Sequence, residues 1–336
     1  MNGSRPRALL ISPSFFGYEQ EIVDELGRQG LDAEFLDERP SNSSILKAIY
    51  RVNVRAAANQ VDRYYRRVAK SMVWQDLSLV LVIRGEIVPP WFLTLVRSKA
   101  PDATIVFYSW DSVQNSSNFA KLLPFFDHLY SFEEGARELD DRFRIKHLFY
   151  SPSFSPLGED TPRRFDGSFI GTLHSGRYAF AKRAFSSFRS SYTYFFVQAR
   201  WYFALRRIFD RRYRAVPRRD VTFSKLTHAQ VADVFRNSLA VLDMQHENQT
   251  GLTMRTFEVL ASGAYLITTN ASIRKTSLIS TDRVIVVDED VDPEQLIEIL
   301  RAKPVPDAAP EGFDEYSLQS WVRGFVELLD PKVNAS

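Results

Sequence analysis

Residues 249–270 read QTGLTMRTFEVLASGAYLITTN, and this stretch decides the fold that we expect. It holds a polar turn, a short amphipathic run, a glycine and then an apolar segment. Because one glycine precedes the run and another follows it, we expect a helix over about residues 252–262 and then a buried strand. The first turn of such a helix offers unpaired backbone N–H groups and the positive end of the helix dipole, and the hydroxyls of Thr250 and Thr253 lie beside them. The stretch therefore predicts an anion site.

Two charged residues on this helix are matched to the two halves of a nucleotide. Gly251 precedes the helix, and Arg255 and Glu258 lie three positions apart, so they share one helical face. A guanidinium can bind phosphate oxygens in a fork, and a carboxylate can accept hydrogen bonds from both hydroxyls of a ribose. The alternative is an ordinary Arg–Glu pair on a helix surface, since pairs at this spacing are common.

The residues around this helix alternate in the same way between apolar strands and amphipathic helices. SFIGTLHSGR, residues 168–177, is a short apolar segment that breaks at Gly171 just before a predicted helix. Because alternation with short polar connections is typical of parallel sheets, we expect residues 166–312 to form a Rossmann-like α/β domain. Its other strands are YTYFFVQ, LAVLDMQ, AYLITTN and RVIVVDED, and its helices include THAQVADVFRNSL.

The first 150 residues show a second alternation of this kind. RALLISPSFFGYEQEIVDELGRQGLDAEFLDERP predicts a strand, a loop with one glycine, an amphipathic helix and another strand. A helical stretch over about residues 44–72 follows, and LSLVLVIRG is the continuous apolar run expected of a parallel strand that is buried on both faces. The remaining strands are ATIVFYSWD, HLYSF and IKHLFY, and the remaining helices are VPPWFLTLVRSKA and NFAKLLPFF.

These patterns predict two domains, as the length of 336 residues also favours. Residues 1–150 form the first Rossmann-like domain, and residues 151–165, rich in Pro, Ser and charge, form a linker. Residues 313–336 close the chain with an amphipathic helix that is expected to pack back on the first domain. Two such doubly wound domains facing each other would place a cleft between the carboxyl ends of their sheets.

Composition excludes several function classes. The chain has no cysteine, so thiolate nucleophiles, disulfides and Cys-ligated zinc are excluded, and its five histidines show no metal-ligand spacing. No apolar run approaches the ~18 residues of a membrane span, and the opening MNGSRPRALLIS lacks the apolar core of a signal peptide. We therefore expect a cytoplasmic protein that uses no metal.

The net charge is only +2, but two stretches concentrate the basic residues. Residues 51–70 and residues 199–219 both interleave arginine with aromatic or aliphatic residues at helical spacing. Such helices could contact an anionic membrane surface or hold an anionic acceptor. The alternative is a solvated basic face with its aromatic residues packed inward.

Several of these segments resemble one enzyme family. GLTMRTFEVLASGAYLITTN resembles the donor-binding signature of GT-B glycosyltransferases, in particular of bacterial polysaccharide and lipopolysaccharide biosynthesis enzymes with group 1-like donor domains. SFIGTLHSGR resembles the loop that opens the second domain of that family. FGYEQEIVDELGRQGLDAEFLDERPSNSS and VFYSWDSVQN resemble its first-domain motifs, so the resemblance spans most of the chain.

The resemblance implies roles for particular residues. It implies that Arg255 contacts the diphosphate of a nucleotide sugar, that Glu258 contacts the ribose, and that the donor loop is lined by Gly171, Thr172 and His174. The sequence departs from the family pattern at one position. Many retaining members carry a further glutamate eight positions before the one that corresponds to Glu258. Here that position is Thr250, which leaves the contact to the sugar and the stereochemical outcome undetermined.

Glycosyl transfer with inversion needs a base that deprotonates the acceptor hydroxyl. Asp111 in YSWDS and Glu86 in IRGE follow predicted strands of the first domain, at the edge where doubly wound folds place their sites. Either carboxylate could instead cap a helix or form a loop salt bridge. Arg84 and Tyr18 could assist with acceptor or phosphate.

Three further motifs have a functional and a plain interpretation. His174 and Arg177 could reach the leaving diphosphate, or could belong to a solvated loop. SPSFFGYE has one glycine where the dinucleotide fingerprint needs three, so nicotinamide binding is unsupported. Asp288 and Asp290 form a D-x-D, but the acidic run leads to Asp292, which is well placed to cap the next helix.

Residues and resemblance together predict a metal-independent GT-B glycosyltransferase that transfers a hexosyl or related sugar. Its expected partners are a nucleotide-sugar donor and a glycan or lipid-linked acceptor in bacterial surface polysaccharide or lipopolysaccharide biosynthesis; no cofactor and no nucleic acid is expected. Its expected location is the cytoplasm, with peripheral contact to the inner face of the plasma membrane. Two alternatives stay open, a nucleotide-sugar 2-epimerase on the same fold and a non-catalytic relative that binds a nucleotide or glycan.

Overall fold

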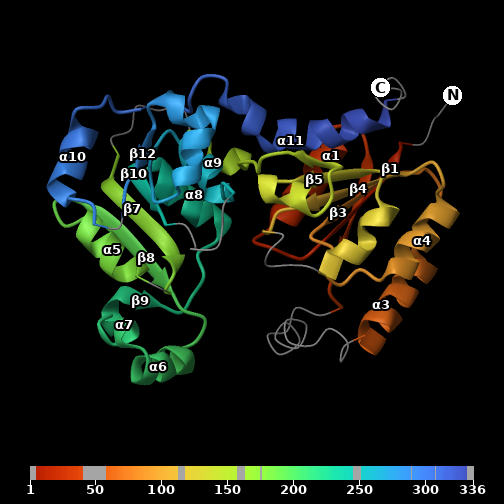
Figure 1. Ribbon diagram of the computed structural model, residues 1–336, viewed down its shortest axis with the longest axis horizontal. Coiled ribbons are helices and arrows are strands. Elements are labelled where there is room, and N and C mark those ends of the chain that lie inside the picture. Colours follow the sequence, from red (N-terminus) through yellow and green to blue (C-terminus); the bar gives the residue numbers. More distant parts are fainter. Residues whose placement is uncertain are drawn as a thin grey trace. The chain divides into compact units, whose positions relative to one another are not determined.

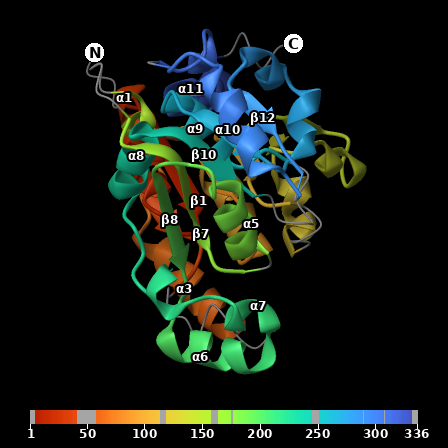
Figure 2. The ribbon, with the colours of Figure 1, turned by 90° about the vertical axis from the view of Figure 1, so that its left-hand side faces the viewer.

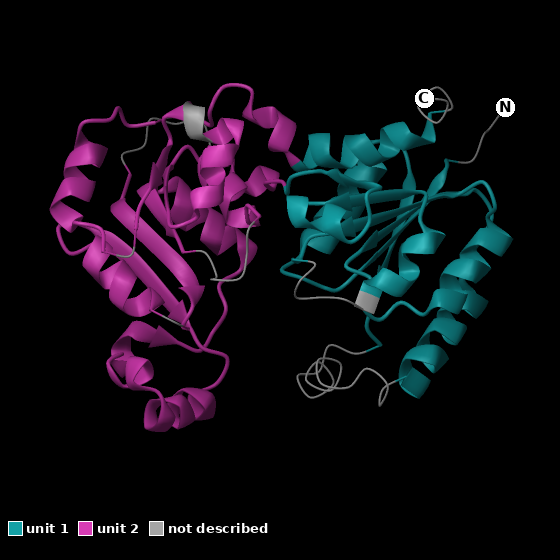
Figure 3. Cartoon of the chain, in the orientation of Figure 1, with its two compact units in different colours: residues 1–148, 318–336 teal, residues 149–317 magenta. Residues whose placement is uncertain are grey.

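The structure is a computed structural model, and the chain in it divides into two compact units (Figure 3). Unit 1 comprises Met1–Leu148 with Leu318–Ser336, and unit 2 comprises Phe149–Ser317. No helix within the described ranges is both long and apolar enough to span a lipid bilayer. The structure describes residues 5–40, 58–112, 118–156, 163–174, 176–244, 251–288, 290–306 and 308–330.

Unit 1 is built on a six-stranded parallel sheet with the order β2-β1-β3-β4-β5-β6. Six of the seven residues of β3 are buried, as its continuous apolar sequence predicts for a central parallel strand. The order reverses between β1 and β3, so the switch point of this sheet lies at the carboxyl ends of these two strands. The strands are β1 (Arg7–Ser12), β2 (Asp32–Asp37), β3 (Leu77–Ile83), β4 (Thr104–Ser109), β5 (His128–Ser131) and β6 (Phe143–Ile145).

Helices cover this sheet, and the last of them comes from the far end of the chain (Figure 1). Trp321 and Phe325 of this last helix are buried, and the ring of Trp321 lies 5.0 Å from that of Tyr108 on β4. The chain thus returns to unit 1 at Leu318. The helices are α1 (Tyr18–Arg28), α3 (Ala58–Ser71), α4 (Pro90–Lys99) and α11 (Leu318–Val326), with 3-10 segments η3 (Asn118–Phe125), η4 (Glu134–Glu138) and η10 (Glu327–Leu329).

The structure corrects two expected elements of unit 1. NFAKLLPFF forms the 3-10 segment η3 and no α-helix, because Pro124 inside it cannot donate a backbone hydrogen bond. The last strand is β6, slightly before the predicted IKHLFY, because the Lys146 carbonyl accepts a hydrogen bond from the Tyr108 hydroxyl where the chain leaves the sheet. The first part of the helix expected over residues 44–72 lies outside the described residues, and the described part is α3.

Unit 2 is a second six-stranded parallel sheet, with the order β12-β11-β10-β7-β8-β9 and helices on both faces (Figure 2). The switch point of this sheet lies between β7 and β10. Its strands are β7 (Phe165–Thr172), β8 (Ser191–Phe196), β9 (Val221–Thr222), β10 (Ser238–Asp243), β11 (Tyr265–Thr268) and β12 (Val284–Val286). Its helices are α5 (Arg177–Ala184), α6 (Arg200–Phe209), α7 (Arg211–Arg214), α8 (His228–Arg236), α9 (Met254–Ala261) and α10 (Pro293–Arg301). Its 3-10 segments are η5 (Pro152–Phe154), η6 (Arg218–Asp220), η7 (Ala271–Lys275), η8 (Ser277–Thr281) and η9 (Phe313–Tyr316).

Local sequence signals explain where these helices begin and end. Thr227 and Gln230 form a capping box at the start of α8. The carboxylate of Asp292 accepts a hydrogen bond from the backbone N–H of Glu294 at the start of α10, as the sequence predicts for this acidic run. Gly263 follows the cap residue of α9 with φ 72°, a left-handed conformation that suits glycine at a helix end.

Part of the stretch that we expected to be a linker is packed inside unit 2. Phe154 is fully buried, and its ring lies 5.7 Å from that of Phe235 in α8. The guanidinium of Arg163 donates hydrogen bonds to several backbone carbonyls, among them those of Ser238 and Gly263. Residues 157–162 of this stretch lie outside the described residues.

Candidate functional site

The switch point of unit 2 brings together most of the predicted donor-site residues. Helix α5 follows β7 and helix α9 follows β10, so the amino ends of both helices lie at the carboxyl edge of the sheet. The helix predicted over residues 252–262 is α9, Met254–Ala261, and Thr253 is its N-cap residue. In an open α/β sheet, this edge is where ligands bind.

Arg255 is held in a fixed orientation across this switch point. Its Nη1 donates a hydrogen bond of 2.6 Å to the carbonyl of Ile170 on β7, and its guanidinium carbon lies 5.3 Å from the ring centroid of Phe235. A cation over an aromatic face is attracted to the ring quadrupole. Arg255 therefore bridges from α9 to β7 with a guanidinium that is oriented from two sides.

Arg177 approaches the same edge from the other helix. It is the first residue of α5, and its Nη2 donates a hydrogen bond of 2.9 Å to the carbonyl of Met244, just after β10. Burial lowers the pKa of Arg177, Asp243 opposes this effect, and the positive charge of Arg255 adds to it. The two guanidinium groups are thus close enough to repel each other.

Asp243, the last residue of β10, interacts electrostatically with both arginines and was not among the residues predicted from sequence. It is buried, which raises the pKa of its carboxyl, and the charges of Arg255 and Arg177 counteract that rise. The Thr253 hydroxyl lies 3.4 Å from Asp243 Oδ2 and makes no cap to α9. The backbone N–H groups in the first turn of α9 are therefore not covered by the side chain of their N-cap residue.

Glu258 lies one turn further along α9, with only 4% of its surface exposed. Its Oε1 is 3.7 Å from Nε2 of His228, the first residue of α8, so the two form an ion pair when the imidazole is protonated. The ring of His228 also contacts that of Phe154, at 4.8 Å between centroids. Sequence reasoning missed His228, since no local pattern connects the start of α8 with α9.

Gly171 fits its place at the end of β7 because it lacks a side chain. A Cβ atom there would lie 2.8 Å from Cζ of Phe169 and 3.5 Å from Nη1 of Arg177. The next predicted loop residue, Thr172, ends β7 and is exposed. The backbone carbonyl of His174 accepts a hydrogen bond from the Arg177 N–H, which ties the loop to the start of α5.

Two predicted donor-site residues remain, Gly251 and Thr250, and the structure describes only the first of them. Gly251 is buried, and its carbonyl accepts a hydrogen bond of 3.2 Å from Nδ2 of Asn270 after β11. Thr250 lies outside the described residues.

Unit 1 presents a second cluster at its own switch point. Arg84 directly follows β3 with φ 75°, a left-handed conformation that is uncommon for a residue with a side chain. Its Nη2 lies 3.0 Å from Glu86 Oε2, and its Nε lies 3.1 Å from Asp111 Oδ2 at ion-pair distance but without hydrogen-bond geometry. Burial acts to lower the pKa of Arg84, but the carboxylates of Asp111 and Glu86 outweigh it and the pKa is raised. Both predicted candidates for the base therefore share one arginine.

Glu86 does not cap the following helix, because the N-cap residue of α4 is Pro89. The alternative of a loop salt bridge does describe Glu86 and Asp111, since both pair with Arg84. Tyr18, at the start of α1, is buried.

Glu38 is the residue of this cluster that sequence reasoning missed. It directly follows β2 and is 0% exposed, and neither carboxylate oxygen has a hydrogen-bond partner in the described part of the chain. Burial raises its pKa to about 8, although Arg84 and Arg39 act against this rise. At neutral pH this carboxyl is therefore mostly protonated. The signal that could have found it is the position that also singled out Asp111, a carboxylate that follows a predicted strand.

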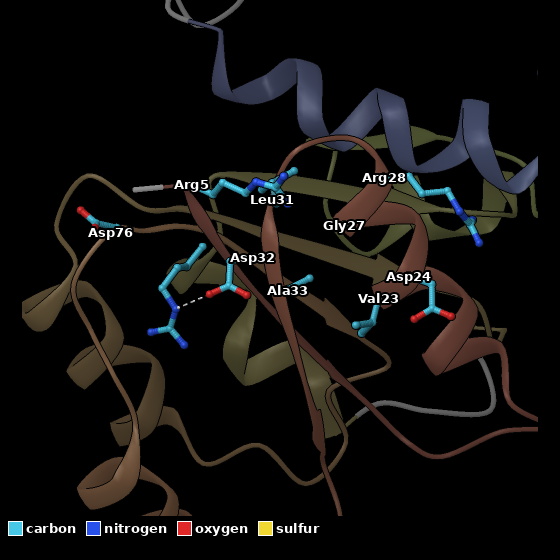
Figure 4. Close-up of a pocket in the computed structure, with 10 residues that line it drawn as sticks. Arg5, Val23, Asp24, Gly27, Arg28, Leu31, Asp32, Ala33 and Asp76 are labelled. Carbon is cyan, nitrogen blue, oxygen red and sulfur yellow. Dashed lines mark ion pairs between the residues drawn. The ribbon is translucent and has the colours of Figure 1, made fainter. Parts of the chain in front are cut away.

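A pocket of about 690 Å³ lies elsewhere on unit 1, at the amino end of β1 and β2 (Figure 4). Arg7 and Asp32 line it and form an ion pair at 3.5 Å between Nε and Oδ2. Because it is at the sheet edge opposite to Arg84 and Glu86, we assign it no part in the chemistry.

Comparisons with known proteins agree with this fold. Residues 198–307 match the family model described as "Glycosyl transferase-like". A comparison with curated protein sequences gave no match. Among solved structures the chain is similar to a glycosyltransferase involved in avilamycin A biosynthesis, with 13% identity, a TM-score of 0.61 and coverage of 98% of this chain and 99% of that one.

Two further solved structures are similar to the chain over most of its length. The chain is similar to HepE from Anabaena in complex with UDP and glucose, with 9% identity, a TM-score of 0.59 and coverage of 96% and 99%. It is also similar to UDP-GlcNAc 2-epimerase from Methanocaldococcus jannaschii, with 11% identity, a TM-score of 0.51 and coverage of 96% and 99%. The predicted fold is confirmed: the chain has the GT-B fold, with a glycosyltransferase-like segment in its second half.

Proposed function

We propose that the protein is a glycosyltransferase that moves a sugar from a nucleotide-activated donor to a glycan or lipid-linked acceptor. The observation that carries this proposal is the pair Arg177 and Arg255 at the switch point of unit 2, beside the amino end of α9. The match to the glycosyltransferase-like family model supports it, since residues 198–307 include Thr253, Arg255 and Glu258.

The two arginines are suited to the diphosphate of the donor. A guanidinium has five N–H donors, and the Ile170 carbonyl uses only one of those of Arg255. Both side chains carry positive charge at an edge where burial weakens solvent screening, so they would stabilise the negative charge that develops on the departing nucleoside diphosphate. The uncapped first turn of α9 adds backbone N–H donors to the same place. These groups supply the stabilisation without a metal, and we propose a metal-independent reaction.

Glu258 would hold the ribose of the same nucleotide. Its carboxylate is one helical turn beyond Arg255, and it can accept hydrogen bonds from two vicinal hydroxyls. His228 at 3.7 Å would limit the orientations that this carboxylate can take.

The base is proposed to come from Asp111 or Glu86 of unit 1. In the transfer, the acceptor oxygen attacks the anomeric carbon, the bond from that carbon to the diphosphate oxygen breaks, and the acceptor proton passes to the carboxylate. Arg84, at ion-pair distance from both carboxylates, would hold them in place for this step.

The finer assignment rests on the resemblance of the sequence motifs. We place the activity in bacterial surface polysaccharide or lipopolysaccharide biosynthesis, with a hexosyl or related sugar as the transferred group and the inner face of the plasma membrane as the place of action. A 2-epimerase is the second candidate, because an enzyme of that activity shares the fold over 96% of this chain.

Calorimetric titration with UDP, GDP, CDP and CMP, in EDTA and without added metal, tests the donor site. We expect one nucleoside diphosphate to bind selectively, Glu258→Gln to weaken that binding, and Arg301→Ala, at the exposed end of α10, to leave it unchanged. Incubation with the matching nucleotide sugar then separates the candidates. A transferase releases nucleoside diphosphate faster when acceptor is added, an epimerase converts the donor alone, and a non-catalytic relative binds without turnover.

A further inference from the structure

One helix of unit 2 presents a row of large apolar side chains to solvent. Trp201, Leu205, Ile208 and Phe209 of α6 are 71%, 45%, 65% and 78% exposed. They recur at spacings of four, seven and eight residues, so they share one face of the helix. A contiguous exposed apolar face of this kind marks an interaction site in a soluble domain.

The opposite face of α6 already anchors the helix to unit 2. Phe203 is buried against Tyr213 of α7, at 6.2 Å between ring centroids. The Tyr213 hydroxyl donates a hydrogen bond of 2.6 Å to the carbonyl of Leu173, next to the loop residue His174. Because the inner face supplies this packing, the outer apolar row is not needed to fold the helix.

Arginines surround the apolar row. Residues 200–219 contain eight arginines and a single acidic residue, Asp210. Asp210 pairs with Arg206 at 2.8 Å and with Arg212 at 3.2 Å, and the other arginines have no carboxylate within ion-pair distance apart from Arg219, which lies near Asp220, in the part of the chain that the structure describes. Most of this positive charge is therefore uncompensated.

The other basic and aromatic stretch, residues 51–70, packs its aromatic side chains inward in the part that the structure describes, helix α3. On α3 the aromatic residue Tyr65 is fully buried, and Tyr64 packs against the core of unit 1, while Arg63 and Arg67 face solvent. That helix is an ordinary basic face with its aromatic side inward. Of these two helices, as far as the structure describes them, it is α6 that combines exposed arginines with an exposed apolar row.

We infer that α6 and α7 form a docking surface for an anionic lipid bilayer; we call Trp201, Leu205, Ile208 and Phe209 with the arginines of residues 200–219 the α6–α7 surface. Aliphatic and aromatic side chains in one row can enter the boundary between headgroups and acyl chains, while the arginines contact lipid phosphates. Leucine and isoleucine offer no stacking to nucleic-acid bases, so the combination fits lipid better than a nucleic acid.

The position of the α6–α7 surface within unit 2 determines which part of that unit would lie near the bilayer. Figures 1 and 2 both show α6 and α7 projecting beyond the end of β8, away from α8, α9 and α10. Through Tyr213 and Leu173 the surface is bonded to the loop after β7. Docking would therefore hold the carboxyl edge of this sheet close to the bilayer. The inference does not depend on the proposed enzymatic activity.

Cosedimentation of the full chain with vesicles tests it. We expect binding to phosphatidylcholine vesicles that contain about a third phosphatidylglycerol, little binding to pure phosphatidylcholine, and loss of binding at high salt. Trp201→Ser with Phe209→Ser, and separately Arg211→Glu with Arg214→Glu, should each weaken binding on the order of tenfold or more. Arg63→Glu with Arg67→Glu on α3 changes the net charge by the same amount and should have little effect.

A second readout follows the tryptophan itself. Brominated lipids should quench the fluorescence of the wild-type protein more than that of Trp201→Phe. Failure to bind anionic vesicles, equal binding by the α6–α7 variants, or an equal loss in the α3 control would overturn the inference. So would a dimer in solution that Trp201→Ser with Phe209→Ser dissociates, since the surface would then be an interface between copies of the chain.

Discussion

Arg177 and Arg255 reach across the switch point of unit 2 in opposite directions. Each begins on a helix that follows one of the two central strands and donates a hydrogen bond to a backbone carbonyl on, or just after, the other strand. Arg177 begins the helix after β7 but donates to the carbonyl of Met244 after β10, at 2.9 Å. Arg255 lies on the helix after β10 but donates to the carbonyl of Ile170 on β7, at 2.6 Å. The two guanidinium groups are thus oriented by backbone atoms, and the charge of Asp243, which interacts with both, offsets part of theirs.

Substitution of the proposed base should reduce the turnover rate without weakening the binding of the donor nucleotide. If Asp111 is the base, Asp111→Asn lowers kcat by about 10²-fold to 10⁴-fold and leaves the dissociation constant of the nucleotide unchanged, because the residue is in unit 1. Glu86→Gln gives the corresponding result if Glu86 is the base. Steady-state kinetics and calorimetry on both variants identify the base, and full activity in both would refute this part of the proposal.

Glu38 predicts a dependence of stability on pH. Its folded pKa of about 8 is above the ordinary value of 4.5, so the folded state retains a proton that the unfolded chain has lost. The free energy of unfolding should therefore fall as pH rises from 4.5 to about 8, by on the order of 1 kcal/mol for each pH unit.

The variant Glu38→Gln isolates this effect, because it keeps the shape of the side chain but cannot ionise. Urea denaturation at pH 5 and pH 9 should show that it gains stability relative to wild type as pH rises. Glu138→Gln, at an exposed position on η4, is the control and should show a constant difference. A constant difference for Glu38→Gln as well would contradict the account of its burial.

Gly171→Ala should destabilise unit 2. The added Cβ would lie 2.8 Å from Cζ of Phe169, so the Phe169 ring must move, at a cost of about 1–3 kcal/mol, whereas its distance of 3.5 Å from Nη1 of Arg177 is an ordinary contact. Gly176→Ala is a matched control five residues away, since a Cβ there meets no atom within 4 Å. Thermal unfolding of both variants measures the difference, and equal melting temperatures would show that the end of β7 is not tightly packed.

The sequence predicted the architecture well because its signals are local. Glycines bracket α9, apolar runs mark the strands, and Asp292 and Pro293 mark the start of α10. The strand-end rule also led to Glu86 and Asp111, which the structure joins through Arg84.

What the sequence could not predict depends on contacts between distant segments. His228 meets Glu258 only because α8 packs beside α9, and Glu38 is unusual only because the fold buries it near Arg84. The two basic stretches show the same limit. Tyr65 on α3 meets a core and Trp201 on α6 does not, although both helices mix arginine with aromatic residues.

The most direct test of the central claim is the contribution of the β-phosphate to nucleotide binding. Calorimetry should compare the preferred nucleoside diphosphate with its monophosphate in wild type, Arg177→Ala, Arg255→Ala and the control Arg301→Ala. If both arginines hold the diphosphate, wild type and control should bind the diphosphate about 10-fold to 100-fold more tightly than the monophosphate, and each site variant should lose most of that ratio. An unchanged ratio in both site variants would show that the diphosphate is not bound between Arg177 and Arg255.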